Sequence, residues 1–320
     1  MLEIIDKADK IILFELERNS RISETALAKL IHKSKEAVRY RIAKLQRRGI
    51  LKRFTLFINP ATLGFVSGKI YYKLANKPKR KQKLFELVKS DKRLFWLGVA
   101  DGAWDAGLTF FVKNTIEFYD LKNQLTAQFH DIILEADTGV LVEIFVKDKT
   151  IFEQKANDWK TMWRHVPTPI ILDSLETKIV DILFKNSREN VVAIARQANT
   201  TVDIVRSRMR KLEREQLITK YTVDIDYEKL GFEFYKTFLT LNGLAPQIET
   251  KFKEFCMQEP GIIHIVKQIS PWDIELEILC QSYAEYNQLI KRLTATFADQ
   301  IINVQTAVMN EDHVFPAYKS

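Results

Sequence analysis

Residues 23–45, with the sequence SETALAKLIHKSKEAVRYRIAKL, decide the fold of this chain. Ser23 and Ser34 can each cap a helix, because a serine hydroxyl accepts a hydrogen bond from a backbone N–H of the first turn. The second of these helices has apolar residues at i, i+4 and i+7, namely Val38, Ile42 and Leu45. Two helices joined by a short turn, with arginine on the outer face of the second, are typical of a helix-turn-helix unit that binds DNA.

The flanking sequence completes a small three-helix domain. Asp6 can cap a preceding helix, in which Ile12 and Leu16 recur at helical spacing. Gly49 is expected to end the last helix, because glycine readily adopts the left-handed conformation found at helix ends. The apolar run at 54–58 predicts a strand directly after this domain.

The chain repeats this pattern 167 residues later. Residues 4–65 align with residues 171–232 without a gap, and 20 of the 62 pairs are identical. The triplet Asn-Ser-Arg at 19–21 recurs at 186–188, for example. A period of this length indicates a duplicated module, because solenoid repeats are far shorter.

Each copy continues with alternating strands and helices. In the first copy the apolar pattern predicts strands at 69–74, 94–99, 107–112 and 140–146, and helices at 79–89 and 116–129. In the second copy it predicts strands at 234–241, 262–269, 274–279 and 301–309, and helices at 246–257 and 283–297. The order βαββαβ is the ferredoxin-like arrangement, so the fold class is α+β.

Residues 151–170 connect the two copies. Trp159 and Trp163 are four residues apart and would share one face of a helix. Pro167 and Pro169 stiffen the end of this segment. Two interpretations stay open: a helix packed on the first copy, or a clamp between the copies.

Composition and charge narrow the function. No apolar run approaches the ~20 residues that span a bilayer, so we expect a cytoplasmic protein without membrane contact. Cys256 and Cys280 are too few for a disulfide framework or a four-ligand zinc site, and no metal is predicted. The net charge is +8, of which residues 1–65 carry +7 and residues 168–232 only +1. The first DNA-binding unit should therefore hold DNA more tightly than the second.

The face that would contact DNA follows from helical geometry. Because the apolar stripe must face the core, Lys35, Arg39 and Tyr40 are left to enter a major groove, where arginine can bind guanine with two hydrogen bonds. Cations at the sides of the helix would contact phosphates. The candidate DNA-binding residues of both copies are Ser34, Lys35, Arg39, Tyr40, Arg41, Lys44, Arg47, Arg48, Thr201, Arg206, Ser207, Arg208, Arg210 and Arg214.

These motifs resemble the Lrp/AsnC, or feast/famine, family of transcription regulators. The resemblance rests on the helix-turn-helix and on segments such as Asn19-Ser20-Arg21-Ile22-Ser23, Val38-Arg39-Tyr40-Arg41-Ile42 and Leu63-Gly64-Phe65, and it covers nearly the whole chain twice. It implies, in each copy, a winged helix-turn-helix, a hinge strand and a RAM-type βαββαβ domain for effector binding and dimerisation. The expected divisions are 1–53, 54–66, 67–150, the connector 151–170, then 171–220, 221–233 and 234–320.

The resemblance also implies partners. Double-stranded DNA is the expected partner, and the two copies are expected to form a pseudo-dimer within one chain. Two such chains are then expected to associate as a dimer of pseudo-dimers. No cofactor is expected, but family members often bind an amino acid or another small metabolite near a Gly-x-x-Asp turn. The tentative effector-binding residues are therefore Gly102, Trp104, Asp105, Trp272 and Asp273, although Ser270 and Pro271 replace the glycine segment in the second copy.

Two other functions remain as alternatives to a sequence-specific regulator. An architectural, chromatin-like protein would bind DNA with little sequence preference. Siroheme decarboxylases resemble Lrp/AsnC proteins in fold, but only His264 matches their motif here, and a lone histidine beside an apolar strand is more often structural. No catalytic residue is assigned, and the protein is expected not to be an enzyme.

Overall fold

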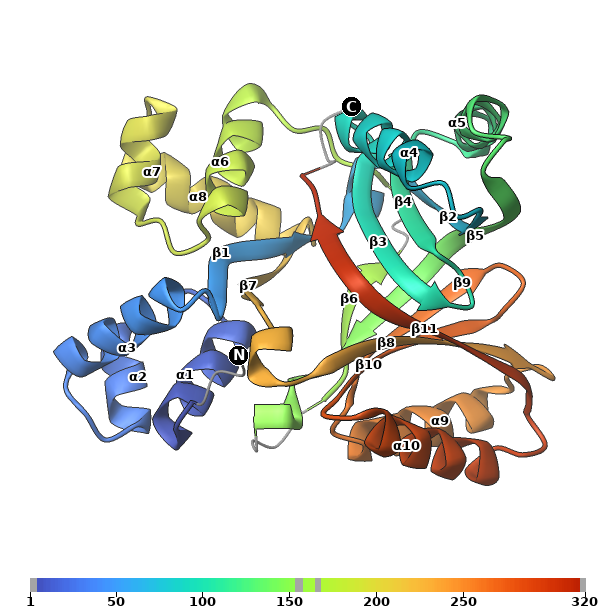
Figure 1. Cartoon of the computed structure of the whole chain (residues 1–320). Coiled ribbons are helices and arrows are strands. Elements are labelled where there is room, and N and C mark those ends of the chain that lie inside the picture. Colours follow the sequence, from blue (N-terminus) through green and yellow to red (C-terminus); the bar gives the residue numbers. More distant parts are fainter. Residues whose placement is uncertain (1–4, 153–157, 165–167, 317–320) are drawn as a thin grey trace.

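The computed structural model describes residues 5–152, 158–164 and 168–316. Two helical lobes lie on one side of the molecule, and a large sheet covered by helices lies on the other (Figure 1). Ile4, Pro167 and part of the connector, which the sequence analysis used, lie outside the described residues.

Each helical lobe is a three-helix domain. Head 1 consists of α1 (Lys7–Arg18), α2 (Glu24–Leu30) and α3 (Lys35–Arg47), and head 2 of α6 (Ser174–Lys185), α7 (Val191–Ala198) and α8 (Val202–Arg214). The side chains of Asp6, Ser23 and Ser34 accept hydrogen bonds from backbone N–H groups of the first turn, as the sequence predicts. Gly49, just beyond α3, has a φ of 67°, which is the left-handed conformation expected there.

The strands that follow the two heads pair with each other. β1 (Leu51–Ile58) and β7 (Ile218–Ile225) form an antiparallel ribbon in which Thr55 lies opposite Thr222. These threonines occupy equivalent positions of the two copies, as do Ser20 and Ser187, whose hydroxyl oxygens are 2.5 Å apart. Because equivalent residues meet at both places, a pseudo-twofold axis passes between them. The structure thus confirms a pseudo-dimer within one chain.

Each hinge strand completes the core of the other copy's head. Leu56 and Ile58 of β1 are buried in the core of head 2, and Val223 and Ile225 of β7 are buried in the core of head 1. Full burial of one such side chain stabilises the fold by roughly 1.5–3 kcal/mol. Neither head can therefore separate from the other copy without exposing part of its own core.

The predicted βαββαβ order is present in both copies. The first contains β2 (Val66–Leu74), α4 (Pro78–Ser90), β3 (Leu94–Gly102), β4 (Ala106–Val112), α5 (Thr115–Gln128) and β5 (Ile133–Val146). The second contains β8 (Glu233–Leu241), α9 (Pro246–Gln258), β9 (Ile262–Ile269), β10 (Ile274–Cys280), α10 (Tyr283–Thr296) and β11 (Ile301–Val314). Short 3₁₀ helices lie at Pro60–Leu63, Thr150–Phe152 and Glu228–Leu230. Leu84 and Leu121 anchor α4 and α5 on the first sheet, and Phe252 and Leu289 anchor α9 and α10 on the second.

The two sheets join at their edges into one closed ring. Its strand order is β2-β4-β3-β11-β8-β10-β9-β5, and β5 also pairs with β2. The two strands that close the ring are β5 and β11, each 14 residues long. The first half of each strand pairs with a strand of its own copy, β2 or β8, and the second half pairs with a strand of the other copy, β9 or β3. The predicted strands 140–146 and 301–309 missed residues 133–139 and 310–314. Those segments carry polar residues such as Glu135 and Asp312, so the apolar pattern does not mark them.

The ring encloses aromatic side chains from both copies. One buried cluster includes Tyr71, Trp96, Trp104, Phe238 and Trp272. The ring centroids of Tyr71 and Trp272, from different copies, are 4.9 Å apart with an interplanar angle of 72°, an edge-to-face contact. The two effector-type sheets therefore face each other within the chain.

A buried ionic network lies beside these rings. The Glu275 carboxylate accepts hydrogen bonds from the ammonium groups of Lys69 and Lys236, each at 2.6 Å, and from the Tyr71 hydroxyl at 2.8 Å. Burial alone would raise the pKa of Glu275, but the charges of Lys236 and Lys69 outweigh it and bring that pKa to about 2. Lys69 and Lys236 are equivalent residues of the two copies, whereas Glu275 and its neighbour Glu277 both belong to the second copy. The first copy thus depends on the second to neutralise Lys69.

The connector contains a strand, so the interpretation as a helix was wrong. β6 (Lys160–Arg164) pairs with β5 at the edge of the sheet. Trp163 lies in a buried cluster that includes Val266 of the second copy. The Trp159 indole N–H donates to the Lys253 carbonyl on α9 at 3.0 Å. Trp159 therefore bonds to the second copy, whereas the Trp163 ring lies 5.2 Å from that of Phe111 in the first copy and shares a buried cluster with Val266 of the second, an arrangement consistent with the clamp interpretation.

The described residues contain no helix that is both long and apolar enough to cross a membrane. Cys256 and Cys280 are both buried as free thiols. In the same part of the chain, no three histidine, cysteine or acidic side chains lie close enough together to hold a metal ion.

Candidate nucleic-acid interface

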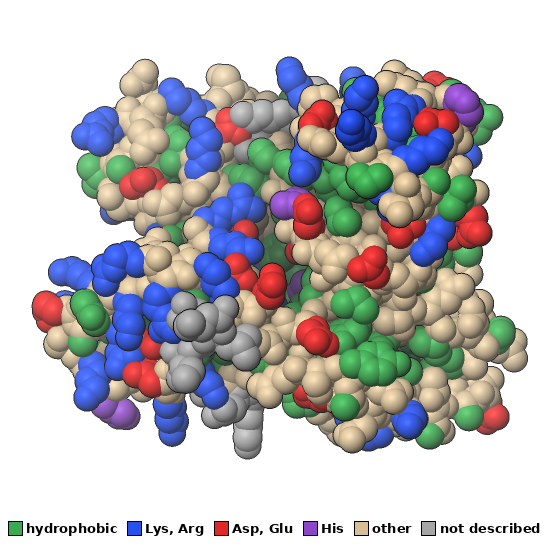
Figure 2. All heavy atoms as spheres, in the orientation of Figure 1, with side chains coloured by type: hydrophobic (Ala, Val, Ile, Leu, Met, Phe, Trp, Pro, Cys, Tyr) green, Lys and Arg blue, Asp and Glu red, His purple; other side chains and the backbone are tan. Residues whose placement is uncertain are grey.

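The outer face of α3 carries exposed cations. Lys35, Arg39 and Arg47 are exposed, as is Tyr40, and the Arg47 guanidinium lies 5.9 Å from the Tyr40 ring centroid. Arg39 forms an ion pair with Glu24 at 2.7 Å, yet 63% of its side chain is exposed. Figure 2 shows lysine and arginine side chains gathered on the lobe that head 1 forms. These groups are placed as a recognition helix requires, with arginine able to reach base edges.

The equivalent face of α8 is less basic. Arg206, Ser207, Arg210 and Arg214 are all exposed. Arg206 pairs with Asp203 at 3.4 Å, and Arg214 pairs with Glu215 at 3.6 Å. Carboxylates on or next to the helix therefore offset part of the positive charge of head 2.

Arg41 and Arg208, two of the candidate DNA-binding residues, form ion pairs within their own heads. Arg41 donates to the carboxylates of Asp6 at 2.8 Å and Asp9 at 2.7 Å. Burial would raise the pKa of Asp6, but the hydrogen bonds from the Asp9 backbone and from Arg41 lower it below its usual value. Arg208 bonds in the same way to Asp173 and Glu176, at 3.0 and 2.9 Å. Both arginines thus join the first helix of a head to the last, and their contact with DNA stays a prediction.

The other candidates lie at the ends and sides of the recognition helices. Ser34 and Thr201 are the N-cap residues of α3 and α8, where backbone N–H groups can meet a phosphate. Lys44 is half-buried on the side of α3. Arg48 is the C-cap residue of α3, and its carbonyl accepts a hydrogen bond from Lys229 at 3.1 Å.

Two arginines that the sequence analysis did not select join the heads at the pseudo-twofold axis. Arg21 donates to the carbonyls of Ser187 and Glu189, at 2.6 and 3.0 Å. Arg188 makes the equivalent bonds to Ser20 and Ile22, at 2.7 and 3.1 Å. This exchange fixes the position of one recognition helix relative to the other. The signal in the sequence was the repeated triplet Asn-Ser-Arg, which shows where the copies match but not that they touch.

The Trp-Asp turns of the two sheets have structural roles. Asp105 accepts a hydrogen bond from the backbone N–H of Leu74 at 2.7 Å, and Asp273 accepts one from Leu241 at 2.7 Å. Each aspartate thereby ties its turn to the end of the neighbouring strand.

The turn glycine and the two tryptophans are closely packed. Gly102 has a φ of 117°, and a Cβ there would lie 2.4 Å from the carbonyl oxygen of Thr306. Trp104 and Trp272 are 3% and 4% exposed. Their indole N–H groups have no acceptor among the described residues, so they remain donors that water or a ligand can satisfy. The effector site at these turns stays a prediction.

Comparison with known proteins agrees with this geometry. A family model described as winged helix-turn-helix DNA-binding matches residues 5–52. An uncharacterised HTH-type transcriptional regulator of Pyrococcus furiosus is 39% identical over 143 residues, which are 44% of this chain and 95% of the relative. LrpA of Pyrococcus abyssi, an HTH-type transcriptional regulator, is 35% identical over 89 residues, 28% of this chain and 60% of the relative. An uncharacterised regulator of Pyrococcus horikoshii is matched over only 42% of its length.

The chain is therefore a member of the helix-turn-helix transcriptional regulators. Within that class it belongs to the Lrp/AsnC family, as the sequence motifs predict. Since 44% of this chain covers 95% of the Pyrococcus furiosus relative, that relative corresponds to one of the two copies here.

Among solved structures, some resemble nearly the whole chain. The crystal structure of the siroheme decarboxylase NirDL aligns with a TM-score of 0.66, covering 98% of this chain and 95% of that chain, at 13% sequence identity. At this identity the likeness concerns the fold. It confirms the two-module α+β architecture.

Proposed function

We propose that this chain is a transcriptional regulator that binds double-stranded DNA through both heads at once, as a pseudo-dimer, in the cytoplasm. The observation that supports this most directly is the presence of two exposed basic recognition helices, α3 and α8, related by one pseudo-twofold axis. Heads related by a twofold axis fit half-sites about one helical turn apart, roughly 34–36 Å, on one face of the duplex.

The two half-sites should contribute unequally. Head 1 offers Arg39, Tyr40 and Arg47 on its exposed face, with an acid, Glu24, paired to Arg39. In head 2 both Arg206 and Arg214 are paired with acids. Each neutralised phosphate adds affinity and salt dependence. We therefore propose an imperfectly palindromic site in which the half bound by head 1 dominates.

Sequence-specific binding is the proposal that separates a regulator from an architectural protein. The experiment selects bound fragments from genomic DNA with the full chain, then compares affinities for a selected site and for unrelated DNA at one salt concentration. A regulator is expected to bind its site at least ~10³-fold more tightly. A ratio near one would support the architectural alternative and reject this proposal.

We propose no enzymatic role. The imidazole of His264 is hydrogen-bonded through Nδ1 to the Glu277 carboxylate within the ionic network, so it already has a structural partner. Incubation of the full chain with siroheme under reducing and oxidising conditions tests this. Any decarboxylated product would overturn it.

A dimer of pseudo-dimers and a small-metabolite effector complete the proposal. Leu134 and Ile302 occupy equivalent positions in β5 and β11, and each is 65% exposed, which suits a symmetric contact between chains. Multi-angle light scattering should give twice the chain mass of 37.4 kDa.

Thermal-shift screening with amino acids tests whether a small-metabolite effector binds, with Asp105→Ala and Asp273→Ala as variants.

A further inference from the structure

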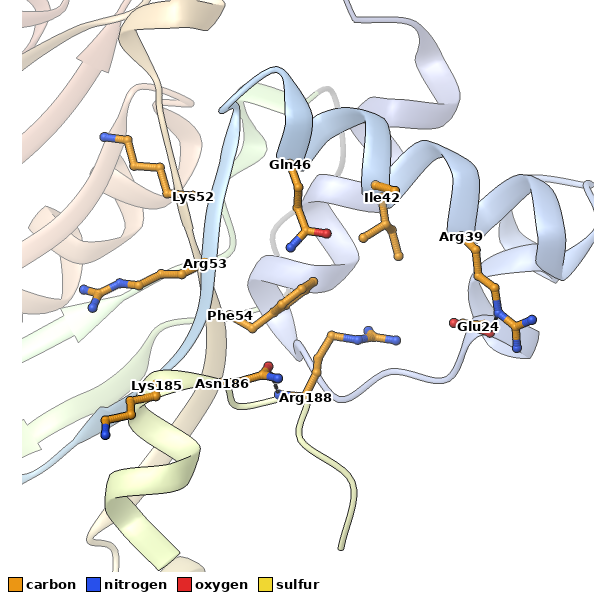
Figure 3. A pocket seen from close by; sticks show the side chains of 11 residues that line it. Glu24, Arg39, Ile42, Gln46, Lys52, Arg53, Phe54, Lys185, Asn186 and Arg188 are labelled. Carbon is orange, nitrogen blue, oxygen red and sulfur yellow. Dashed lines mark hydrogen bonds and ion pairs between the residues drawn. The ribbon is translucent and has the colours of Figure 1, made fainter. Parts of the chain in front are cut away.

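A groove of about 390 Å³ runs between head 1 and the end of α6. One wall is formed by Arg39, Ala43 and Gln46 of α3, and the opposite wall is formed by Lys185, Asn186 and Arg188 (Figure 3). Ile42 and Phe54 supply apolar surface between the walls, and Lys52, Arg53 and Glu24 complete the lining. The groove therefore combines residues from both copies of the module.

The lining of this groove is strongly basic. Five of its side chains are cationic, and Glu24, paired with Arg39 at 2.7 Å, is its one acid. Arg53 lies 3.3 Å from Asp224 of β7, and 35% of its side chain is exposed. Lys52 lies 3.6 Å from Asp226, just beyond β7, and 49% of its side chain is exposed. Lys185 is exposed and has no ion-pair partner among the described residues.

Arg188 adds a directed donor to this wall. Its Nη1 donates to the carbonyls of Ser20 and Ile22, and its guanidinium carbon lies 5.4 Å from the Phe54 ring centroid. These contacts hold the guanidinium at the inner end of the groove. A preorganised arginine beside exposed lysines is an arrangement that binds phosphate groups well.

The pseudo-twofold axis supplies an internal comparison. At the equivalent place beside α8, Thr219 replaces Lys52 and Glu213 replaces Gln46. Lys220, which replaces Arg53, is buried against Glu17 at 2.7 Å, and Arg18, which replaces Lys185, pairs with Asp148 at 3.1 Å. Arg206 and Arg21 replace Arg39 and Arg188, so cations remain at this place, but it has one fewer cation and its lysine is buried in an ion pair. The positive charge of the groove is not a requirement of the fold.

We propose that this groove is a phosphate-binding site that bridges the two heads. The phosphate belongs either to the DNA backbone beside the half-site of head 1 or to a free phosphorylated metabolite, and the recognition chemistry is the same for both. If the phosphate belongs to DNA, this proposal rests on the proposed function. If it is a free metabolite, the proposal stands independently, since a free phosphate would bind without DNA. Occupancy would join α3 to α6 and so fix the spacing of the heads.

The test uses the full chain with two groove variants, Lys185→Ala and Lys52→Thr, the second of which installs the residue found on the other side of the axis. The matched control is Lys178→Ala, an exposed lysine of the same helix α6 that does not line the groove. Isothermal calorimetry with inorganic pyrophosphate measures free-phosphate binding. Fluorescence anisotropy of a selected DNA site in a salt series measures backbone contacts.

For a DNA phosphate, both groove variants should reduce the slope of log K against log salt by about one unit, and the control should not. For a free phosphate, both should weaken pyrophosphate binding about tenfold and leave that slope unchanged. The groove is rejected if wild type binds DNA but both groove variants match Lys178→Ala in the two assays. If wild type binds no DNA at all, the proposed function fails, and unchanged pyrophosphate binding in the variants would reject the groove as well.

Discussion

Replacing Glu275 with alanine should destabilise the chain more than other single substitutions in the ring. The carboxylate is fully buried, and it neutralises Lys69 and Lys236 at 2.6 Å each. After its removal Lys236 still has Glu277, but Lys69 keeps no carboxylate. Removing one partner of a buried ion pair costs about 3–5 kcal/mol, because the remaining charge stays desolvated. We expect a loss of this size in the free energy of unfolding.

The assay is urea unfolding followed by tryptophan fluorescence, since Trp96 and Trp104 lie in the same interior. Lys69→Met/Glu275→Leu should be more stable than Glu275→Ala, because it removes both charges and leaves Lys236 paired with Glu277. Glu135→Ala, an exposed acid on β5, is the control and should change stability by less than about 0.5 kcal/mol. A cost below about 1 kcal/mol for Glu275→Ala, or a double variant less stable than the single one, would refute this reasoning.

Three more results are expected. The pKa of Glu275 is about 2 in the folded chain, against an ordinary value of 4.5, so the folded state binds fewer protons than the unfolded one. The free energy of unfolding should therefore fall as the pH drops from 4.5 towards 2. Urea midpoints between pH 5 and 3 measure this decline, and Glu275→Gln should flatten it. Gly102→Ala should lower the free energy of unfolding by about 1–3 kcal/mol more than Gly243→Ala. Both glycines have a positive φ, but only at Gly102 would the new Cβ lie against the backbone, 2.4 Å from the carbonyl oxygen of Thr306. Equal melting temperatures of the two variants would contradict this. Arg41→Ala should lower the free energy of unfolding by about 1–3 kcal/mol and leave the salt slope of DNA binding unchanged, whereas Arg47→Ala should reduce that slope by about one unit at unchanged stability. Fluorescence anisotropy and urea unfolding of both variants measure the two effects. The reverse pattern would show that Arg41 contacts DNA.

Local patterns predicted the helices and most strands well. The caps at Asp6, Ser23 and Ser34 and the apolar spacing within each helix are determined by near neighbours in the chain, so they can be recognised without a structure. The 167-residue repeat likewise predicted two modules and, with the family resemblance, their pairing.

Features that depend on contacts between residues far apart in the sequence were not predicted. The polar start of β5 becomes a strand because β2 offers it backbone partners, and β6 forms because β5 has a free edge. The bonds of Arg41 to Asp6 and Asp9 were not expected, because these partners lie more than thirty residues away and their side chains cannot be located from spacing. The ionic network around Glu275 joins residues from both copies, and no local pattern marks it.

Hydroxyl-radical footprinting of a selected site tests whether one chain places two unequal heads on adjacent half-sites. Wild type should protect two patches about one helical turn apart on one face of the duplex. Arg39→Ala should weaken one patch and Arg206→Ala the other, with the larger loss of affinity for Arg39→Ala. A single patch that responds to only one of these substitutions, or a larger loss for Arg206→Ala, would contradict the account.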